Sequence, residues 1–321
     1  MVIQTQHIPE AEVIEAVAQG LSAERKSLPS WMLYDETGDK LFQEIMRLPE
    51  YYPTRCEFEI LNTHKEDLAR YFNEGRTPFT LIELGAGDGT KTDLLLDALM
   101  QLNALFTYSP VDISKHVLDE LATRMSTRHV GLDIRPLHAS YDEALSLLPP
   151  SRKKVLLFLG ANIGNMTIAE AQQFLKATSA RMSRRDVLLI GFDLKKDPRV
   201  IHRAYDDSSG VTRNFNLNVL TRLNHTVAAE FDVAQFNHYA VYNPETGTAA
   251  SYLVSLKDQD VAIKALGKTI HFSQWETIHT EISQKYDLLM IEKMLTSVGL
   301  EITDLFFDKD HYFCDVVAIK Q

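Results

Sequence analysis

The sequence predicts an α/β fold built on a parallel β-sheet, with a second region inserted late in the chain. From residue 79 onward, apolar strand-like runs alternate with helical patterns, which is typical of a parallel sheet covered by helices on both faces. The alternation stops between about Lys196 and Thr280. Two strand-like runs then close the chain, and the short Lys309-Asp310 link between them favours an antiparallel pair.

The individual elements follow from apolar periodicity. Before the sheet, helical spacing marks residues from about Ile8 to Leu21, Lys40–Arg47 and Glu57–Phe72. The sheet region is predicted as strand Phe79–Leu84, helix Lys91–Leu102, strand Phe106–Val111, helix Lys115–Met125, strands Val130–Pro136 and Lys154–Leu159, helix Ile168–Met182, strand Asp186–Ile190, helix Lys285–Val298 and strands Glu301–Phe307 and Tyr312–Ile319. The interrupting stretch contains helix-like Val200–Asp206, Asn-rich Asn214–Asn218, and strand-like Tyr239–Tyr242 and Ala249–Ser255.

This organisation predicts two domains. Residues 1–59 and 196–285 would form a substrate-binding domain, and residues 60–195 and 286–321 would form the domain of the parallel sheet. A doubly wound sheet finished by a strand reversal is the arrangement of class I methyltransferases. An insertion before the terminal strand pair lies near the ligand crevice of such a sheet, which suits substrate binding.

A glycine-rich turn after the first strand of the sheet is the most informative chemical signal. Glu83 is followed by Gly85, Gly87 and a third glycine two residues later, and a helical pattern begins at Lys91. Such a turn leaves backbone N–H groups free and lets a ligand approach the main chain. The third glycine comes one residue too early for the dinucleotide fingerprint. The spacing therefore favours S-adenosylmethionine, and a purely structural turn is the alternative.

Polar residues after the next two strands extend this predicted cofactor site. Asp112 ends the second strand, where a carboxylate can accept hydrogen bonds from ribose hydroxyls; the alternative is an ordinary helix cap. Ser140 and Tyr141 follow the third strand, where methyltransferases hold adenine. Tyr141 either stacks on that ring or is an ordinary loop tyrosine.

The loop after the fourth strand offers uncharged polar groups. It runs from Gly160 to Thr167 and contains Asn162 and Asn165 between glycines. Asn165 can bind a carboxylate or an amine at the carboxyl edge of the sheet, where ligands bind in open α/β folds. The alternative is turn chemistry, because asparagine tolerates a left-handed backbone.

Aromatic and acidic residues outside the sheet region suit a flat or cationic ligand. The aromatic residues are Tyr34, Phe42, Tyr51, Tyr52 and Tyr205, although scattered aromatics also fit a plain core. Glu281 and Ser283 alternate along a strand-like run, so both side chains lie on one face. A carboxylate and a hydroxyl on one face can bind an N–H of a basic heterocycle; the alternative is an exposed strand face.

Composition excludes several classes of protein. The 321 residues carry a formal net charge of −11, whereas a nucleic-acid phosphate track normally needs a basic face. Cys56 and Cys314 lie far apart without metal-ligand spacing, so we expect neither disulfides nor a metal site. No apolar run approaches the roughly 20 residues that span a bilayer, and the first residues lack a secretory pattern. We expect a cytoplasmic protein without nucleic-acid or membrane partners.

Together, these features resemble the histidine Nα-methyltransferases of ergothioneine biosynthesis over essentially the whole chain. The longest matching run is Arg47-Leu-Pro-Glu-Tyr-Tyr-Pro-Thr-Arg55. The other matching segments are Lys26-Ser-Leu-Pro29, Tyr34-Asp35, Leu41-Phe42, Glu83-Leu-Gly-Ala-Gly87, Phe158-Leu-Gly160, Ile163-Gly-Asn165, Arg203-Ala-Tyr-Asp-Asp207, Gly210-Val-Thr212, Phe215-Asn216, Asn218-Val-Leu220 and Thr280-Glu-Ile-Ser283. In that family a Rossmann-like methyltransferase domain binds S-adenosylmethionine. A second domain, made from the N-terminal region and the insertion, binds the amino acid.

The resemblance also implies roles for single residues. The cofactor side would comprise Glu83, Gly85, Gly87, Lys91, Asp112, Ser140 and Tyr141. The substrate side would comprise Asn165 and Tyr205 at the amino-acid end, Tyr51, Glu281 and Ser283 at the imidazole, Gly160 in the loop, and Tyr34 and Phe42 near the amine. Tyr34 and Asn165 would orient the amine for reaction.

Three positions depart from the family pattern. Ser251 stands where the family usually has methionine packed on the imidazole, which widens the pocket. Ser140 replaces an aspartate near the adenine, and Asn162 replaces a small hydroxyl residue that orders the substrate loop. The first departure bears on selectivity, and the other two bear on affinity.

We therefore expect Nα-methylation of histidine to the trimethylated betaine, hercynine, with S-adenosylmethionine as methyl donor and without a metal. By analogy we expect a monomer acting on a small-molecule amino acid. The alternative within the class is N-methylation of tryptophan, tyrosine or a histidine derivative, which Ser251 motivates and Glu281 opposes. Alternatives outside the class are a non-catalytic binding module and an NAD-dependent dehydrogenase, which the glycine spacing disfavours.

Overall fold

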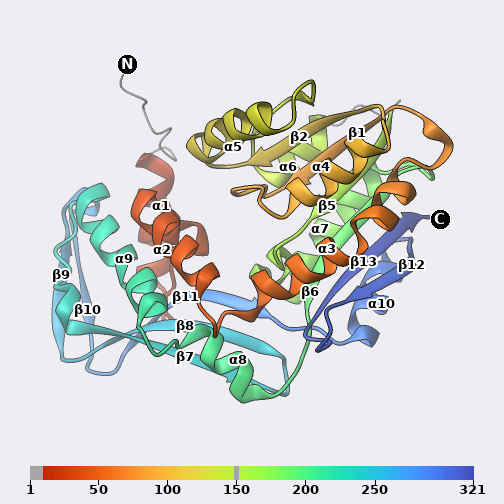
Figure 1. Ribbon diagram of the computed structural model, residues 1–321. Coiled ribbons are helices and arrows are strands. Elements are labelled where there is room, and N and C mark those ends of the chain that lie inside the picture. The colour runs from red at the N-terminus through yellow and green to blue at the C-terminus, as the bar shows by residue number, and fades with distance from the viewer. Residues whose placement is uncertain (1–9, 148–151) are drawn as a thin grey trace. The chain divides into compact units, whose positions relative to one another are not determined.

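The computed structural model describes residues 10–147 and 152–321, which form two compact units (Figure 1). The parallel-sheet unit consists of Pro53–Leu194 and Tyr286–Gln321. The insertion unit consists of the described residues up to Tyr52 together with Lys195–Lys285. The division predicted between residues 59 and 60 falls inside a continuous helix, α3 (Tyr52–Phe72), and the structure moves it to the start of that helix.

The parallel-sheet unit contains a doubly wound sheet of the expected class. Its strands are β1 (Phe79–Leu84), β2 (Phe106–Asp112), β3 (Asp133–Ile134), β4 (Leu137–His138), β5 (Lys153–Phe158), β6 (Val187–Asp193), β12 (Leu300–Phe307) and β13 (Phe313–Lys320). They lie in the order β12-β13-β6-β5-β1-β2-β3, and β4 also pairs with β2. The strands from β6 to β3 are parallel, whereas β13 is antiparallel to both β6 and β12. This arrangement confirms the predicted fold and the terminal strand reversal.

Helices cover both faces of this sheet because the strands are apolar on both sides. Helices α3, α4 (Thr92–Gln101) and α5 (Lys115–Arg128) pack on one face, and α6 (Tyr141–Leu147), α7 (Ile168–Arg181) and α10 (Leu288–Ser297) pack on the other (Figure 1). Successive side chains of each strand pack on opposite faces of the sheet. The first set of helices packs against Leu81, Val155, Leu189 and Val317. The second set packs against Ile82, Leu156, Leu188 and Val316. Because β1, β2 and β5 are parallel, their carboxyl ends lie at the same edge of the sheet.

Two predicted elements of this unit differ from the observed ones. The strand predicted over Val130–Pro136 is replaced by the short strands β3 and β4, because Gly131 has a φ of 89° and Pro136 has no N–H for a sheet ladder. The helix predicted from Lys285 begins at Leu288, where Asp287 caps it by accepting from Met290 N at 2.9 Å. Strand β11 ends at Gln284, and residues 285–287 connect it to the helix, with Tyr286 in an isolated bridge to Leu194.

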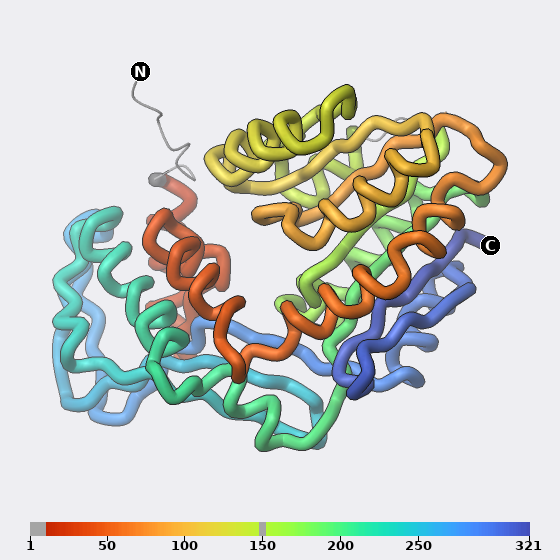
Figure 2. Tube along the Cα trace, viewed as in Figure 1, coloured from red at the N-terminus to blue at the C-terminus, as the bar shows by residue number. Residues whose placement is uncertain are grey.

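The insertion unit combines helices with antiparallel strands (Figure 2). Its helices are α1 (Glu10–Ser22), α2 (Glu36–Arg47), α8 (Pro198–Tyr205) and α9 (Val211–Thr226). Strands β7 (Phe236–Asn243), β8 (Thr248–Ser255) and β11 (Thr277–Gln284) form a three-stranded sheet in the order β11-β8-β7, and β9 (Gln259–Ile263) pairs with β10 (Lys268–Phe272). All of these helices and strands except α8 contribute to one apolar core.

Helix α9 contains the Asn-rich segment whose periodicity did not predict a helix. Two of its asparagines are held by tertiary hydrogen bonds: Asn218 Nδ2 donates to Asp35 Oδ1 at 2.7 Å, and Asn216 Oδ1 accepts from Thr280 Oγ1 at 2.6 Å. The carboxylate of Asp207 accepts from Thr212 N at 2.7 Å and so caps the helix start. These contacts offset the low helix propensity of asparagine.

The inserted segment, Lys195–Lys285, leaves the parallel-sheet unit and returns to it at neighbouring points. The chain leaves the parallel-sheet unit after Leu194, at the end of β6, and returns at Tyr286. Leu194 and Tyr286 form an isolated parallel bridge, and Tyr286 N donates to Asp193 O at 2.9 Å. The two ends of the inserted segment are therefore side by side.

The turn between β12 and β13 depends on one buried carboxylate. Asp308 is 2% exposed, and its side chain accepts from the backbone N–H groups of Asp310, Tyr312 and Phe313 at 3.0, 2.8 and 2.7 Å. We expect Asp308→Ala to lower the free energy of unfolding by about 3 kcal/mol, because it leaves buried donors unsatisfied. Urea denaturation measures the change, and the exposed neighbour Asp310→Ala serves as the control. Equal stability of the two variants would contradict this assignment.

Candidate functional site

The glycine loop after β1 brings three segments of the parallel-sheet unit together. Gly85 and Gly87 have φ angles of 74° and 52°, which favour glycine. A Cβ on Gly85 would lie 2.6 Å from the Tyr141 hydroxyl and 2.7 Å from Asn162 Nδ2, so a side chain there would displace both groups as well as strain the backbone. The loops after β1 and β5 and the start of α6 therefore meet at the carboxyl edge of the sheet, as predicted for a ligand site.

Asp112 supports this loop through its carboxylate. Oδ2 accepts from Gly87 N at 3.1 Å, and Oδ1 accepts from Ser114 N at 2.9 Å. Burial raises the pKa of Asp112, while these N–H groups oppose the rise. The cap of α5 is Ser114, whose hydroxyl accepts from Val117 N, so Asp112 is not the helix cap. Each carboxylate oxygen retains capacity for a further hydrogen bond.

Glu83 lies beneath the loop in the interior. It is buried, and its carboxylate accepts from Thr92 Oγ1 at 2.5 Å and from the Tyr108 hydroxyl. Burial raises its pKa to about 7, and the two hydroxyls lower it. Its hydrogen bonds link β1 to β2 and α4, so this residue holds the loop in place from below.

A carboxylate that the sequence analysis missed anchors both loops at this edge. Glu57 of α3 is fully buried, and its two oxygens accept from Gly160 N at 2.7 and 2.9 Å. The same carboxylate forms an ion pair with Lys91. Burial opposes the charge of Lys91, but the charge of Glu57 and its hydrogen bond favour it, and the pKa of Lys91 is raised.

A missing side chain makes room for Glu57. A Cβ on Gly191 would overlap Glu57 Oε1, so β6 needs glycine at this position. Asp315 is the cross-strand partner of Gly191 and is also fully buried. Neither oxygen of Asp315 has a hydrogen-bond partner among the described residues. Burial, followed by the charge of Glu57, raises the pKa of Asp315 well above its ordinary value and favours the protonated acid.

The remaining predicted residues of this unit lie at the same edge. Asn165 ends the short 3₁₀ helix η3 (Asn162–Asn165), and its side chain is exposed. Tyr141 contacts Phe158 and Phe174 with ring centroids 5.2 and 5.8 Å away, and burial raises its pKa. Ser140 is exposed and forms reciprocal hydrogen bonds with Glu143 at the start of α6. Its hydroxyl therefore has a helix-capping role.

In the insertion unit, four of the five predicted aromatic residues, Tyr34, Phe42, Tyr51 and Tyr205, form one connected series. Phe42 contacts Tyr34 and Tyr51, with ring centroids 5.5 and 6.2 Å apart, and Tyr51 contacts Tyr205 at 6.3 Å. Phe215 of α9 was not among the predicted aromatic residues of the site. Its ring centroid lies 5.5 Å from that of Tyr34 and 5.9 Å from that of Phe42. All these contacts are edge-on or tilted, so the ring faces are not stacked on each other.

Glu281 and Ser283 lie on the same face of β11, as the alternation predicted. Their cross-strand partners on β8 are Ser251 and Ala249, two residues apart. A bulge between His279 and Glu281 shifts the register at this point, a device that often redirects side chains near active sites. Glu281 is half-buried, and the described residues form no hydrogen bond with its carboxylate. Burial raises its pKa to about 7, and Lys285 opposes the rise.

A second missed residue, Lys285, completes a triangle of hydrogen bonds. Lys285 is fully buried, and its Nζ donates to the Tyr205 hydroxyl at 2.6 Å and to Ser283 Oγ at 2.7 Å. The Tyr205 hydroxyl and Ser283 Oγ are themselves 2.7 Å apart. Lys285 continues the every-second-residue series of Glu281 and Ser283, and that series is the signal that could have identified it.

Ser251, where the resemblance implied a wider pocket, contacts the imidazole of His238. It is 1% exposed, and its Oγ lies 3.2 Å from Nε2 of His238 on β7. Burial lowers the pKa of His238 to about 4, so this imidazole is neutral at pH 7. The register partner of Ser251 on β7 is Ala240. Small side chains at Ala240 and Ala249 therefore flank Ser251 on this strand face.

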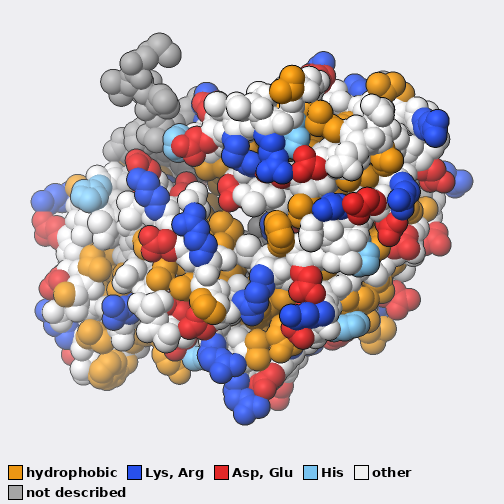
Figure 3. All heavy atoms as spheres, in the orientation of Figure 1, with side chains coloured by type: hydrophobic (Ala, Val, Ile, Leu, Met, Phe, Trp, Pro, Cys, Tyr) orange, Lys and Arg blue, Asp and Glu red, His pale blue; other side chains and the backbone are white. Residues whose placement is uncertain are grey.

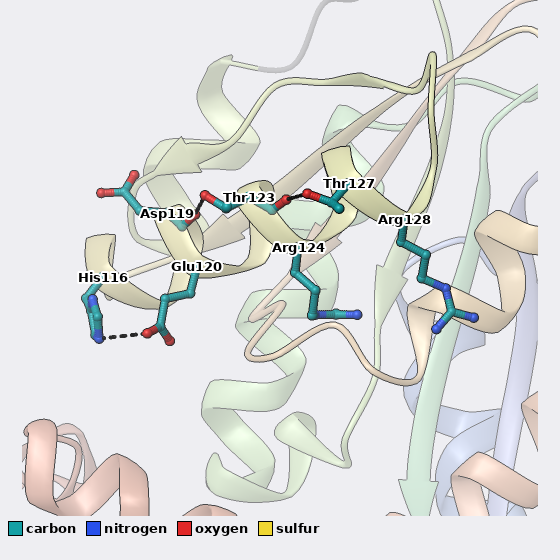
Figure 4. A pocket seen from close by; sticks show the side chains of 7 residues that line it. All are labelled: His116, Asp119, Glu120, Thr123, Arg124, Thr127 and Arg128. Atoms are coloured by element: carbon teal, nitrogen blue, oxygen red, sulfur yellow. Dashed lines mark hydrogen bonds and ion pairs between the residues drawn. The ribbon is translucent and has the colours of Figure 1, made fainter.

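A shallow hollow elsewhere contains none of these residues. It runs along α5 and is lined by His116, Asp119, Glu120, Thr123, Arg124, Thr127 and Arg128 (Figure 4). All seven belong to one helix, and Nε2 of His116 lies 3.3 Å from Oε1 of Glu120, one turn further along it. The described part of the chain contains no group of three or more His, Cys, Asp or Glu side chains arranged for a metal ion.

Comparison with known proteins gives the family. A profile described as histidine-specific, SAM-dependent methyltransferase matches residues 13–320. The histidine N-alpha-methyltransferase of Mycobacterium tuberculosis is 38% identical over 284 residues, which cover 88% of this chain and 87% of that protein. Ergothioneine biosynthesis protein 1 of Neurospora crassa is 33% identical over 285 residues, covering 86% of this chain and 31% of that protein. A solved mitomycin 7-O-methyltransferase matches the fold at a TM-score of 0.50 and 13% identity, over 97% of this chain and 67% of that one.

The buried ion pair of Glu57 with Lys91 generates a stability prediction. We expect Glu57→Gln to lower the free energy of unfolding by about 3 kcal/mol, because it leaves Lys91 without its counter-charge. Urea denaturation measures this difference. Glu66→Gln, an exposed change on the same helix, is the matched control. A loss no larger than that of the control would refute an anchoring role for Glu57.

Because the pKa of Glu281 is raised, we expect that replacing this carboxylate stabilises the folded protein, by an amount that depends on pH. Because the folded-state pKa of about 7 exceeds the ordinary 4.5, the folded protein disfavours the ionised form above pH 7. Without ligand, we expect Glu281→Gln to be up to about 3 kcal/mol more stable than wild type at alkaline pH. The gain should vanish as the pH falls below about 4.5. Thermal unfolding across pH tests this, with exposed Glu245→Gln as control. A constant difference across pH would contradict it.

Proposed function

Because the chain belongs to the family of histidine-specific, S-adenosylmethionine-dependent methyltransferases, we propose that it methylates the α-amine of histidine, up to hercynine, in ergothioneine biosynthesis. The observation that carries the choice of acceptor is the half-buried Glu281 carboxylate beside Ser283 on one strand face. A carboxylate that accepts an imidazole N–H discriminates strongly, because a ligand without that N–H leaves the charge unpaired.

The carboxyl edge of the parallel sheet suits the methyl donor. We assign Gly85 and Gly87 to close backbone approach, Asp112 to the ribose hydroxyls, Lys91 to the amino-acid tail and Tyr141 to the adenine. The free capacity of the Asp112 oxygens and the positive φ of both glycines support this assignment. Glu83 and Ser140 would act indirectly, by holding the loop and the start of α6. Bound S-adenosylmethionine supplies an electrophilic methyl group on a positively charged sulfur.

The chain's own residues would bind and orient the amino acid. The amine must be neutral to attack, so one proton leaves it and passes to water for each methyl group transferred. We assign Asn165 and Tyr34 to orienting the nitrogen lone pair, with Gly160 in the same loop as Asn165. Tyr205, Tyr51 and Phe42 would hold the rest of the amino acid. Alignment of nucleophile and methyl carbon supplies most of the rate enhancement in such a displacement.

Other aspects of the function stay predictions. We propose a cytoplasmic monomer that has no nucleic-acid or membrane partner. The net charge of −11 disfavours a nucleic-acid partner, and the face drawn in Figure 3 mixes acidic and basic side chains. Within residues 10–147 and 152–321, no helix combines the length and apolar character needed to cross a membrane.

Mass spectrometry of reactions containing S-adenosylmethionine and each amino acid in turn tests the proposal. We expect mono-, di- and trimethylated histidine with wild type. Glu281→Gln should lower kcat/KM for histidine by about a hundredfold or more, because the N–H loses a charged acceptor. Exposed Glu245→Gln is the control and should match wild type. Turnover of another amino acid without histidine methylation would refute the proposal.

Tryptophan, tyrosine or a histidine derivative is the second candidate acceptor. The small side chains of Ser251, Ala240 and Ala249 on one strand face favour it, because none of them has the bulk of the methionine that the family pattern has at position 251. The same screen decides between the candidates. If tryptophan were the acceptor, Glu281→Ala would reduce histidine turnover far more than tryptophan turnover.

A further inference from the structure

We propose that Lys285 is a positioning residue that makes the hydroxyl pair of Tyr205 and Ser283 donate a hydrogen bond to the acceptor's ring. The insertion unit would then recognise a ring nitrogen lone pair in addition to the N–H recognised by Glu281. This inference rests on the proposed function, and it specifies which form of the heterocycle the site accepts.

The geometry is a closed triangle in the interior of the insertion unit. Lys285 Nζ lies 2.6 Å from the Tyr205 hydroxyl and 2.7 Å from Ser283 Oγ, and these oxygens are 2.7 Å apart. The exposed fractions are 0% for Lys285, 8% for Tyr205 and 6% for Ser283. Lys285 also lies 4.7 Å from the centroid of the Tyr205 ring, which fixes the cation over that side chain.

A count of donors gives the direction of these hydrogen bonds. An ammonium group can only donate, so both hydroxyl oxygens must accept from Lys285. Between the two hydroxyls, one donates to the other. One hydroxyl hydrogen is therefore always directed outside the triangle. With Tyr205 donating to Ser283, as in the structure, that hydrogen belongs to Ser283, whose oxygen already accepts twice.

Glu281 supplies the opposite polarity on the same strand face. Its carboxylate can only accept when ionised, whereas Ser283, two residues along, offers a donor. A neutral imidazole has one N–H and one nitrogen lone pair and satisfies both groups. An imidazolium ion has two N–H groups and no lone pair, and indole or pyrrole has only the N–H. Each of these would leave the Ser283 hydrogen facing a group that cannot accept it.

The simpler alternative is that Lys285 acts only as a counter-charge for Glu281. The two roles differ in what they predict for ligands. A counter-charge influences how well Glu281 accepts an N–H, whereas the proposed role governs recognition of the lone pair. Ligands that lack one feature and retain the other therefore separate the two explanations.

Two families of histidine isosteres serve as probes. The pyrrol-2-yl and pyrrol-3-yl analogues of alanine keep an N–H, at one or the other ring position, and lack the lone pair. Thiazol-4-yl-alanine keeps a lone-pair nitrogen and lacks the N–H. Dissociation constants are measured by calorimetry with saturating S-adenosylhomocysteine, so that no turnover occurs. Work at about pH 9 keeps Glu281 ionised, since its pKa is about 7.

With wild type, we expect both kinds of analogue to bind at least about tenfold more weakly than histidine, because each leaves one buried polar group unsatisfied. In Lys285→Met, the pyrrolylalanine isomer that binds more tightly should bind within about threefold of histidine. Thiazolylalanine should still bind at least about tenfold more weakly than histidine. The matched control is Lys154→Met, which removes an equally buried lysine paired with Asp186 in the other unit. It should leave both penalties unchanged even if its Tm falls.

The outcomes separate the two proposals. A pyrrolylalanine penalty that persists in Lys285→Met, or loss of only the thiazolylalanine penalty, would overturn the role of Lys285. If that variant does not fold, wild type alone decides, since equal binding of histidine and either pyrrolylalanine would also overturn it. Failure of histidine to bind wild type would instead refute the proposed function. Histidine binding by wild type therefore tells a failure of the proposed function from a failure of the proposed role of Lys285.

Discussion

The arrangement at the carboxyl edge of the parallel sheet depends on one buried carboxylate, that of Glu57. A charge removed from water must be matched within the protein, and here two hydrogen bonds from Gly160 N and the ion pair with Lys91 match it. Glu57 thereby links α3, the start of α4 and the loop after β5. The space it occupies exists because Gly191 has no side chain, and burial together with the charge of Glu57 raises the pKa of the nearby Asp315.

Three carboxylates of the parallel-sheet unit contrast with Glu281 of the insertion unit. In the parallel-sheet unit, Glu57, Glu83 and Asp112 are bonded to the chain itself and hold loops in position. In the insertion unit, Glu281 is half-buried and its carboxylate is left open, which disfavours its ionised form in the free protein. A ligand N–H would relieve this unfavourable burial. Such local destabilisation is common where a site must recognise a ligand.

Local patterns in the sequence predicted much of this structure. Alternating apolar runs predicted the sheet and its terminal reversal, and period-two alternation predicted the shared face of Glu281 and Ser283. Helix α9 was missed because tertiary contacts of Asn216 and Asn218 override their low helix propensity. The anchoring role of Glu57 was missed because its partner Gly160 lies 103 residues away and leaves no local pattern.

The parallel bridge between Leu194 and Tyr286 bears on how such an enzyme can diversify. The inserted segment begins and ends at neighbouring points on one strand edge, so its length and internal structure are free to vary without displacing the strands that flank it. The helices before Pro53 pack into the same core as the insertion, however. Under the proposed function, recombination that exchanges acceptor specificity must therefore transfer two separate stretches of the gene together, one from each side of residues 53–194.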